Sequence, residues 1–233
     1  MNSKIKAIAF DLDDTLIDTS GLLVPQASKK SCQEMLAHGL QCDLESCLSD
    51  RARMAPTHSH KEIFKIIANT YSPKEFSEEK RQTIAQVGIE HFYNPEIPTQ
   101  IPLMNGASEV LQELSSRYAL YVVTSGSPET QKKKLWATGA QNAFKRHYFV
   151  DGFKGEIKQK AFEDILHREK IQPHELLSIG NRLSQEIRQA KKIGAMTCYF
   201  EYGEHVGEPR LSPHDHPDYT IHTFSEFIPT CKL

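Results

Sequence analysis

An apolar run that ends at a pair of aspartates places the strongest constraint on the fold of this 233-residue chain. Residues 7–10 have the length and composition of a buried strand; Asp11 follows directly and Asp13 lies two residues further on. If this run is a central strand of a parallel sheet, both carboxylates project into the crevice at the carboxyl ends of the strands. Two acids in one crevice repel each other unless a cation lies between them. Mg²⁺ binds carboxylate oxygens, water and substrate phosphate, so the run predicts a Mg²⁺ site.

Phosphoryl transfer is the chemistry that such a pair of aspartates favours. Asp11 can attack phosphorus and form an aspartyl-phosphate, which divides one difficult hydrolysis into two easier steps. Asp13 can act first as general acid and then as general base. The next residue, Asp14, is interpreted as a turn residue.

The stretch Asp11–Leu12–Asp13–Asp14–Thr15 resembles the first signature of the haloacid dehalogenase-like hydrolase superfamily, whose members are mostly Mg²⁺-dependent phosphatases. The resemblance implies a Rossmann-like core, a mobile helical cap that closes over the site, and three further signatures in order along the chain. It also implies that the backbone carbonyl of Asp13 is a metal ligand beside the carboxylate of Asp11.

The second and third signatures supply phosphate-binding groups. The strand end at Thr124 and Ser125 resembles the second, in which a hydroxyl and adjacent backbone N–H groups hold phosphoryl oxygens. The third is a lysine near a helix start, which offsets the charge of the aspartates and the phosphate. Lys158 is favoured for this role, Lys154 is the next candidate, and Lys160 is the third.

The fourth signature is an acidic metal-binding motif after a strand, and it departs from the usual form here. Where the family usually has two aspartates, this chain has Asn181 and Glu186. An Asn carbonyl oxygen can ligate Mg²⁺ without contributing charge, and Glu186 can reach the ion directly or through a bound water. We therefore expect metal ligands at Asp11, Asp13, Asn181 and Glu186, with weaker Mg²⁺ binding than two aspartates would give.

Two kinds of pattern divide the chain. From about residue 26 to residue 93 helical stretches occur without a convincing strand, whereas from Gly106 onward helices and strands alternate. Such alternation predicts a parallel sheet with right-handed crossovers. The helices expected in the first region are 28–38, 44–54, 61–71 and 77–92. In the second region we expect strands at 119–124, 147–150, 176–179, 196–200 and 218–221, and helices at 107–117, 128–137, 159–169, 185–193 and 224–228.

The predicted fold is therefore α/β, with a Rossmann-like parallel sheet and helices on both faces. Residues 1–19 and 104–233 form the catalytic core, and residues 20–103 form the inserted α-helical cap. Residues 18–21 are expected to be the hinge into the cap, and residues 203–217 a surface loop. The polar cap residues that are candidates for substrate contacts, unless they only face solvent, are Arg51, Arg53, His58 and His60.

Composition limits the binding partners, the cellular location and the cysteine chemistry that can be expected. A formal net charge of −2 and a pI near 6.6 give no reason to expect binding to nucleic acid or to an anionic membrane. The start of the chain, residues 1–4, lacks the apolar region of a signal peptide, so a cytoplasmic protein is expected. The run Lys132–Lys133–Lys134 is interpreted as the solvated face of a helix. Five cysteines without C-x-x-C spacing predict reduced thiols rather than a disulfide or a zinc site.

The function predicted from the sequence is Mg²⁺-dependent hydrolysis of a small phosphate monoester, with a small phosphorylated metabolite as partner. The presence of Asp13 favours an ester over a carbon–halogen or carbon–phosphorus substrate, because those reactions need no such acid in this family. Two alternatives stay open at this stage. One is a phosphomutase of the same superfamily, and the other is a catalytically weak relative that binds a phosphorylated ligand or a protein partner.

Overall fold

The computed structural model describes residues 5–233, and the chain forms two compact units. The first comprises the chain up to Asp18 together with Ile97–Leu233, and the second is Thr19–Glu96. Residues 97–103, which the sequence analysis assigned to the insert, group with the first unit because the buried Ile101 donates its backbone N–H to the Ala137 carbonyl. Residues 1–4, where no signal sequence was expected, lie outside the described part of the chain.

A six-stranded parallel sheet forms the centre of the first unit. Its strand order is β3-β2-β1-β4-β5-β6, and every pair of neighbouring strands is parallel. This confirms the predicted α/β fold class. The strands are β1 (Ala7–Phe10), β2 (Ala119–Gly126), β3 (Arg146–Asp151), β4 (Leu176–Gly180), β5 (Met196–Phe200) and β6 (Tyr219–Ile221).

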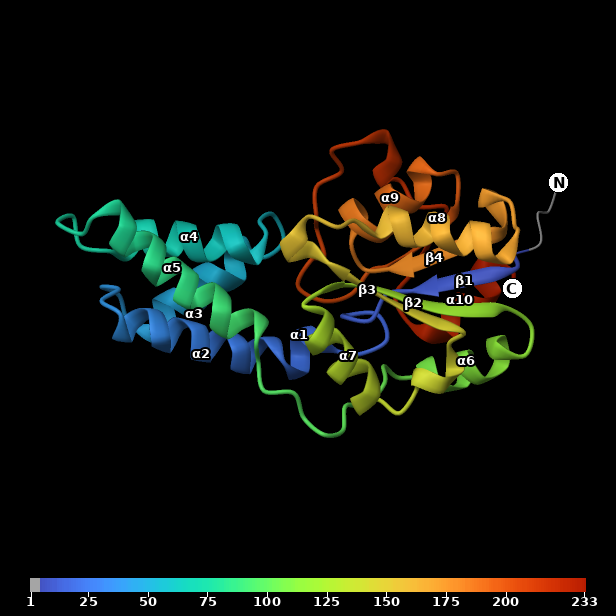
Figure 1. Ribbon diagram of the computed structural model, residues 1–233, viewed down its shortest axis with the longest axis horizontal. Helices are drawn as coiled ribbons and strands as arrows, with labels where there is room; N and C mark the ends of the chain where they lie inside the picture. Colours follow the sequence, from blue (N-terminus) through green and yellow to red (C-terminus); the bar gives the residue numbers. More distant parts are fainter. Residues whose placement is uncertain (1–4) are drawn as a thin grey trace. The chain divides into compact units, whose positions relative to one another are not determined.

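Helices cover both faces of this sheet, as Figure 1 shows, with α8 and α9 on one face and α6, α7 and α10 on the other. The alternation of side chains along β1 explains this, because successive residues of a strand point to opposite faces. Ala7 and Ala9 belong to the apolar cluster that includes Phe162 of α8, whereas Phe10 packs edge-on against Phe227 of α10. The helices of this unit are α6 (Ala107–Ser115), α7 (Pro128–Ala137), α8 (Lys158–Glu169), α9 (Arg188–Lys192) and α10 (Phe227–Cys231).

The second unit consists of helices around a core of its own. Its buried apolar residues, among them Met35 and Phe64, form a cluster separate from that of the sheet. At Gly88 a Cβ would lie 2.5 Å from the sulfur of Met35, so glycine is what allows α2 and α5 to pack closely. The helices are α1 (Thr19–Leu22), α2 (Val24–Ala37), α3 (Leu44–Met54), α4 (His60–Tyr71) and α5 (Glu78–Tyr93).

The structure adds two details to the sequence prediction for this unit. Residues 19–21 of the expected hinge 18–21 lie in the helical turn α1, and the boundary between the two units falls between Asp18 and Thr19. Arg51, one of the candidates for a substrate contact, lies in α3 and is only 3% exposed. Its guanidinium lies 4.9 Å from the centre of the Phe92 ring and 3.2 Å from Nδ1 of His60. Arg51 therefore serves the packing of the helices, and Arg53 pairs with Asp50 on the surface.

A disulfide joins Cys32 of α2 to Cys47 of α3. The prediction of reduced thiols was wrong for this pair. The two residues are separated by 15 positions and lie on different helices, so no short-range spacing signals their contact. Cys42, Cys198 and Cys231 are free thiols.

The segment after β5, predicted to be a surface loop, is anchored by a buried carboxylate. Asp215 has no exposed surface, and Nε and Nη2 of Arg188 donate to its oxygens at 2.6 and 2.7 Å. The backbone N–H groups of Leu211 and Ser212 donate to the same carboxylate. Burial alone would raise the pKa of Asp215, but these hydrogen bonds hold it below the ordinary value of 3.8.

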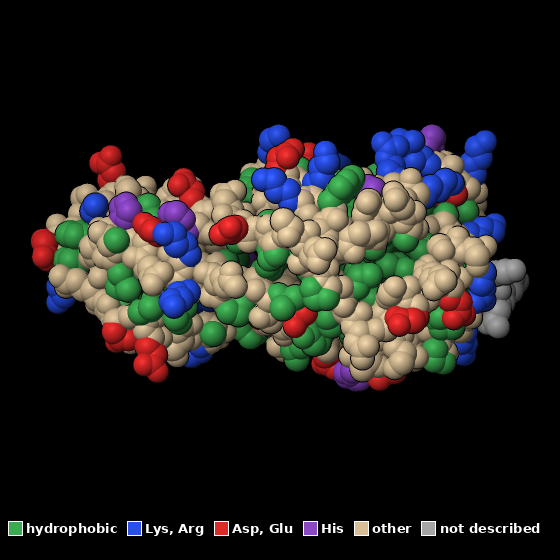
Figure 2. Space-filling view, turned by 90° about the horizontal axis from the view of Figure 1, so that it is seen from below, with side chains coloured by type: hydrophobic (Ala, Val, Ile, Leu, Met, Phe, Trp, Pro, Cys, Tyr) green, Lys and Arg blue, Asp and Glu red, His purple; other side chains and the backbone are tan. Residues whose placement is uncertain are grey.

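The surface carries charges of both signs. On the face shown in Figure 2, Lys and Arg side chains are interspersed with Asp and Glu side chains and with apolar ones, in keeping with the formal net charge of −2. Within residues 5–233, no helix combines the length and the apolar character that crossing a membrane requires.

The disulfide predicts the number of thiols that react. In denaturant without reductant, we expect three thiols per chain to react with a thiol reagent, because only Cys42, Cys198 and Cys231 are free. After reduction all five react. In the control variant Cys32→Ser, Cys47 has no disulfide partner, so four thiols should react without reductant. Five reactive thiols in the untreated wild-type protein would contradict the pairing.

The anchoring role of Asp215 predicts a pH-dependent loss of stability. We expect Asp215→Asn to lower the free energy of unfolding by about 1–2 kcal/mol at pH 7, because the charged hydrogen bonds to Arg188 are lost. The pKa of Asp215 is lowered in the folded state, so its contribution is present above the ordinary value of 3.8 and is lost as the pH falls through the folded value.

Urea denaturation of both proteins between pH 7 and pH 3 measures this difference. The gap between wild type and Asp215→Asn should stay constant down to about pH 4 and then shrink. The control is Glu113→Gln, which removes an exposed pair with Arg117 and should leave the midpoint unchanged. A gap that widens toward low pH contradicts the assignment.

Candidate active site

The first unit gathers most of the predicted site residues at the carboxyl end of its central strand. Asp11 follows β1 directly, donates its backbone N–H to the Ile179 carbonyl of β4 at 2.9 Å, and is 5% exposed. The chain then turns sharply at Asp14, whose φ of 52° lies in the left-handed region that Asp tolerates. A Cβ at Gly203 would lie 2.4 Å from Oδ2 of Asp14, so the glycine makes room for this turn.

A buried lysine joins two carboxylates at this end of the sheet. Nζ of Lys158, in the first turn of α8, donates to Oδ1 of Asp11 at 2.5 Å and to Oε1 of Glu186. The side chains of Lys158 and Glu186 are each 2% exposed. Charges buried this deeply are tolerated only when they are paired and hydrogen-bonded, so the three groups depend on one another.

The cluster of Asp11, Glu186 and Lys158 contains two acids and one base, and all three groups are buried. Burial raises the pKa of Asp11 to about 7, with Lys158 opposing the rise and Glu186 adding to it. Burial alone would lower the pKa of Lys158, but Asp11 and Glu186 hold it above its ordinary value. The site is therefore short of positive charge, a condition that a bound divalent cation would relieve.

Gly180 allows Glu186 to reach this cluster. It is the last residue of β4, and a Cβ there would lie 2.1 Å from Cγ of Glu186. The Oε2 atom of Glu186 accepts from the backbone N–H of Arg182 at 2.9 Å. Both carboxylate oxygens are thus engaged with protein donors, Lys158 and Arg182.

Asp13 has its own set of partners, on α7. Nζ of Lys134 lies 2.8 Å from Oδ1 of Asp13, and Nε2 of Gln131 lies 2.6 Å from Oδ2. The same Gln131 nitrogen is 3.0 Å from Oγ1 of Thr124 and 2.8 Å from the Ser125 carbonyl oxygen. Thr124 is 1% exposed, whereas Ser125 is partly exposed. The structure therefore connects the predicted general acid to the predicted phosphate-binding strand end.

The interpretation of residues 132–134 as a solvated face was wrong for Lys134. Lys132 and Lys133 are exposed, but Lys134 is buried against Asp13. Sequence reasoning also missed Gln131. The available signal was their spacing of three, which places both side chains on one face of the helix that follows Thr124.

The other lysine candidates lie away from this cluster. Lys154 pairs with Asp151 at 3.5 Å and its side chain is 77% exposed, and Lys160 is also exposed. Of the three lysines that the sequence left open, Lys158 is the one that contacts Asp11.

The predicted oxygen donors suit Mg²⁺ by their chemistry. A carboxylate from Asp11, a backbone carbonyl from Asp13 and a side-chain amide oxygen from Asn181 are hard ligands of the kind this ion takes. Asn181 is 3% exposed, and its Nδ2 donates to the Tyr202 carbonyl at 3.3 Å, which orients the amide. The residues present therefore fit a divalent cation.

A second set of polar contacts holds the turn between β4 and α9. The helix expected from residue 185 begins instead with a π-helical turn, Leu183–Ile187. The carboxylate of Glu208 accepts from the backbone N–H groups of Leu183 and Ser184 at its start, at 2.7 and 3.4 Å. Nη1 of Arg182 donates to Nε2 of His205 at 3.0 Å.

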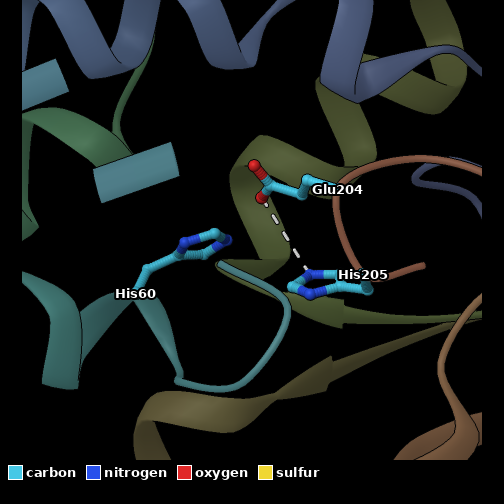
Figure 3. Close-up of side chains that lie close together, drawn as sticks. All are labelled: His60, Glu204 and His205. Carbon is cyan, nitrogen blue, oxygen red and sulfur yellow. Dashed lines mark ion pairs between the residues drawn. The ribbon is translucent and has the colours of Figure 1, made fainter. Parts of the chain in front are cut away.

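Figure 3 shows His205 beside Glu204, with 4.0 Å between Nε2 and a carboxylate oxygen. Because arginine can only donate, Nε2 of His205 acts as an acceptor from Arg182. The 4.0 Å contact is then not a hydrogen bond. These residues stabilise the loop after β5 and were not predicted from the sequence.

Comparison with known proteins establishes the family. The family model for haloacid dehalogenase-like hydrolases matches residues 8–200. The chain therefore belongs to the haloacid dehalogenase-like hydrolases and is an enzyme of that class, which confirms the resemblance drawn from its signatures.

Curated relatives and solved structures agree with this assignment. Glyceraldehyde 3-phosphate phosphatase of Pyrococcus furiosus is 28% identical over 221 residues, covering 94% of this chain and 89% of that protein. The Pyrococcus abyssi protein of the same name is 31% identical over 209 residues, covering 86% and 83%. A haloacid dehalogenase-like family hydrolase from Streptococcus pneumoniae has the same fold, with a TM-score of 0.67 at 20% identity over 98% of this chain and 99% of that one.

The close approach of Gly180 to Glu186 predicts the effect of a single added methyl group. We expect Gly180→Ala to displace Glu186 from Lys158 and to lower the free energy of unfolding by about 1–3 kcal/mol, as overpacking typically does. Thermal or urea unfolding measures the change. The control is Gly152→Ala, because a Cβ there has no described atom within 4 Å. Equal stability of the two variants would contradict the placement of Glu186.

Proposed function

We propose that this protein is a Mg²⁺-dependent phosphatase that hydrolyses a small phosphate monoester through an aspartyl-phosphate intermediate. The observation that carries the proposal is the buried contact of Lys158 with both Asp11 and Glu186, with Asp13 two residues along the chain from Asp11. This arrangement provides a fixed carboxylate nucleophile and a general acid within the same turn of backbone.

In this proposal Asp11 attacks the phosphorus atom and Asp13 protonates the leaving alcohol. Asp13 then removes a proton from the water that hydrolyses the acyl phosphate, so the enzyme returns to its starting state. The Thr124 hydroxyl and the backbone N–H groups beside Ser125 bind phosphoryl oxygens. Lys158 keeps Asp11 oriented and offsets the charge of the phosphoryl group.

Mg²⁺ would be held by Asp11, by the Asp13 carbonyl and by Asn181. Glu186, engaged with Lys158 and Arg182, is assigned to support of the site or to a contact through water. When bound, the ion supplies positive charge that neutralises the phosphoryl oxygens. Because Asn181 is uncharged, affinity for the ion is expected to be lower than with an aspartate there.

The helical unit, Thr19–Glu96, is proposed to be the cap that selects the substrate. The archaeal relatives named glyceraldehyde 3-phosphate phosphatase match most of this chain, so a three-carbon sugar phosphate is the first substrate to test. A small alkyl ester of this kind has a poor leaving group, which suits the use of Asp13 as an acid.

We expect phosphate release from glyceraldehyde 3-phosphate, measured against a panel of sugar and nucleotide monophosphates. Asp11→Asn should lower kcat by about 10³-fold or more, because an amide cannot form the acyl phosphate. Chelation with EDTA should remove the activity, and Mg²⁺ should restore it.

The matched control is Asp43→Asn. Asp43 caps α3 by accepting from the Ser46 N–H, and asparagine caps helices equally well, so this variant should keep full activity. If the wild-type protein releases no phosphate from any ester at millimolar Mg²⁺, the phosphatase proposal is wrong and a ligand-binding role takes its place. Activity that survives Asp11→Asn would exclude Asp11 as the nucleophile.

A further inference from the structure

We propose that Gln131 and Lys134 of α7 are positioning residues that hold the Asp13 carboxylate in place for proton transfer to the leaving oxygen. The inference rests on the proposed function, in which Asp13 is the general acid. It assigns a role in the reaction to two residues outside the four signatures of the sequence.

The two residues hold the two oxygens of one carboxylate separately. Lys134 contacts Oδ1 of Asp13 at 2.8 Å, and Gln131 contacts Oδ2 at 2.6 Å. The carboxylate torsion of an aspartate is broad when the group is unrestrained. Donors on both oxygens restrict that rotation and so fix the plane of the carboxylate. The orientation of this plane determines the direction in which Asp13 can donate a proton.

Gln131 also ties Asp13 to the phosphate-binding end of β2. Its Nε2 lies 3.0 Å from the Thr124 hydroxyl oxygen and 2.8 Å from the Ser125 carbonyl oxygen. One amide nitrogen therefore holds the general acid at a fixed distance from the group that binds phosphate. Proton transfer and phosphoryl binding must act on the same ester bond, so this distance matters for the reaction.

The way Gln131 is bound points to a role other than stability. Its Nε2 has two hydrogens but three acceptors within reach. Its Oε1 is buried and has no hydrogen-bond partner among the described residues. An orphaned buried acceptor costs free energy, and such groups in native structures call for an explanation. Orientation of Asp13 and Thr124 by the amide nitrogen provides one.

The geometry of α7 places Lys134 beside Asp13, on the same face of the helix as Gln131. Positions 131 and 134 lie on one face of α7, which begins at Pro128, with one residue between it and the end of β2. The Lys134 side chain is 9% exposed, whereas Lys132 and Lys133 on the same helix face solvent. The Asp13 side chain is 27% exposed, so it remains accessible to a substrate while Lys134 holds it.

The leaving group of the substrate tests this role directly. An alkyl phosphate expels an alkoxide unless an acid protonates it, whereas p-nitrophenyl phosphate expels a stable phenolate that needs no proton. The comparison is made on the first half-reaction, the single-turnover release of the leaving group, because Asp13 also acts as the base in the second half-reaction for both substrates. We expect Lys134→Met and Gln131→Leu to slow this release from glycerol 3-phosphate by about 10²-fold. The same variants should change the single-turnover release of p-nitrophenolate by less than about threefold, because Asp11 and its partners are intact.

Two reference variants calibrate the comparison. Asp13→Asn should show the same selectivity for the alkyl ester with a larger loss. Lys133→Met replaces an exposed lysine of the same helix and should leave both substrates unaffected. Lys134→Arg, which keeps the charge, should recover part of the activity on the alkyl ester. If Lys134→Met does not fold, Lys134→Gln takes its place, because it keeps a polar group in the buried position.

The outcomes separate this inference from the proposed function. If Asp13→Asn is selective for the alkyl ester but the α7 variants lower both substrates equally or neither, the positioning role is wrong and the phosphatase proposal stands. If wild type releases phosphate from no ester of the panel, or if Asp13→Asn does not discriminate between the alkyl ester and p-nitrophenyl phosphate, the proposed function itself is wrong. If glycerol 3-phosphate is not hydrolysed, the alkyl ester that wild type hydrolyses fastest takes its place. Selective loss in the α7 variants supports the inference.

Discussion

The pairing of one buried ammonium group, that of Lys158, with the carboxylates of Asp11 and Glu186 is the interaction on which the candidate active site depends. The three residues come from the end of β1, where Asp11 follows the strand, from the start of α8 and from the turn after β4, so the cation joins three segments distant in sequence. Each charge would be costly to bury alone. The glycine at position 180 is part of the same arrangement, because the space it leaves is filled by the side chain of Glu186.

The two aspartates of the first signature lie in different environments, and the proposed reaction gives them different roles. Each lies beside a lysine, at 2.5 Å for Asp11 and 2.8 Å for Asp13. Their exposure differs, however, because the Asp11 side chain is 6% exposed and that of Asp13 is 27% exposed. In the proposed reaction, the deeply buried Asp11 keeps one fixed position, as the proposed nucleophile must. The partly exposed Asp13 can exchange protons with substrate and water, as the proposed general acid must.

Sequence reasoning reached the fold and the residues around Asp11 because both depend on local patterns. Apolar runs that end in polar residues located β1, β2 and β4, and the strand ends of a parallel sheet necessarily meet at one side. It failed where a contact depends on the tertiary structure. The helical spacing of Gln131 and Lys134 places them on one face but does not reveal that this face meets Asp13, and the Cys32–Cys47 pair has no recognisable spacing. Glu186 was placed in the right region, but its pairing with Lys158 depends on the space at Gly180.

The protein has two separate apolar cores, and this affects how it unfolds. The buried residues of the helical unit cluster among themselves, and the Cys32–Cys47 bond lies wholly within that unit. The sheet has its own cluster around β1 and β2. A chain built this way can unfold in two stages, so a single melting temperature would not describe it. Because the disulfide lies within the helical unit, reducing agents would act on the stage in which that unit unfolds and leave the stage of the sheet, which carries the proposed site residues, unchanged.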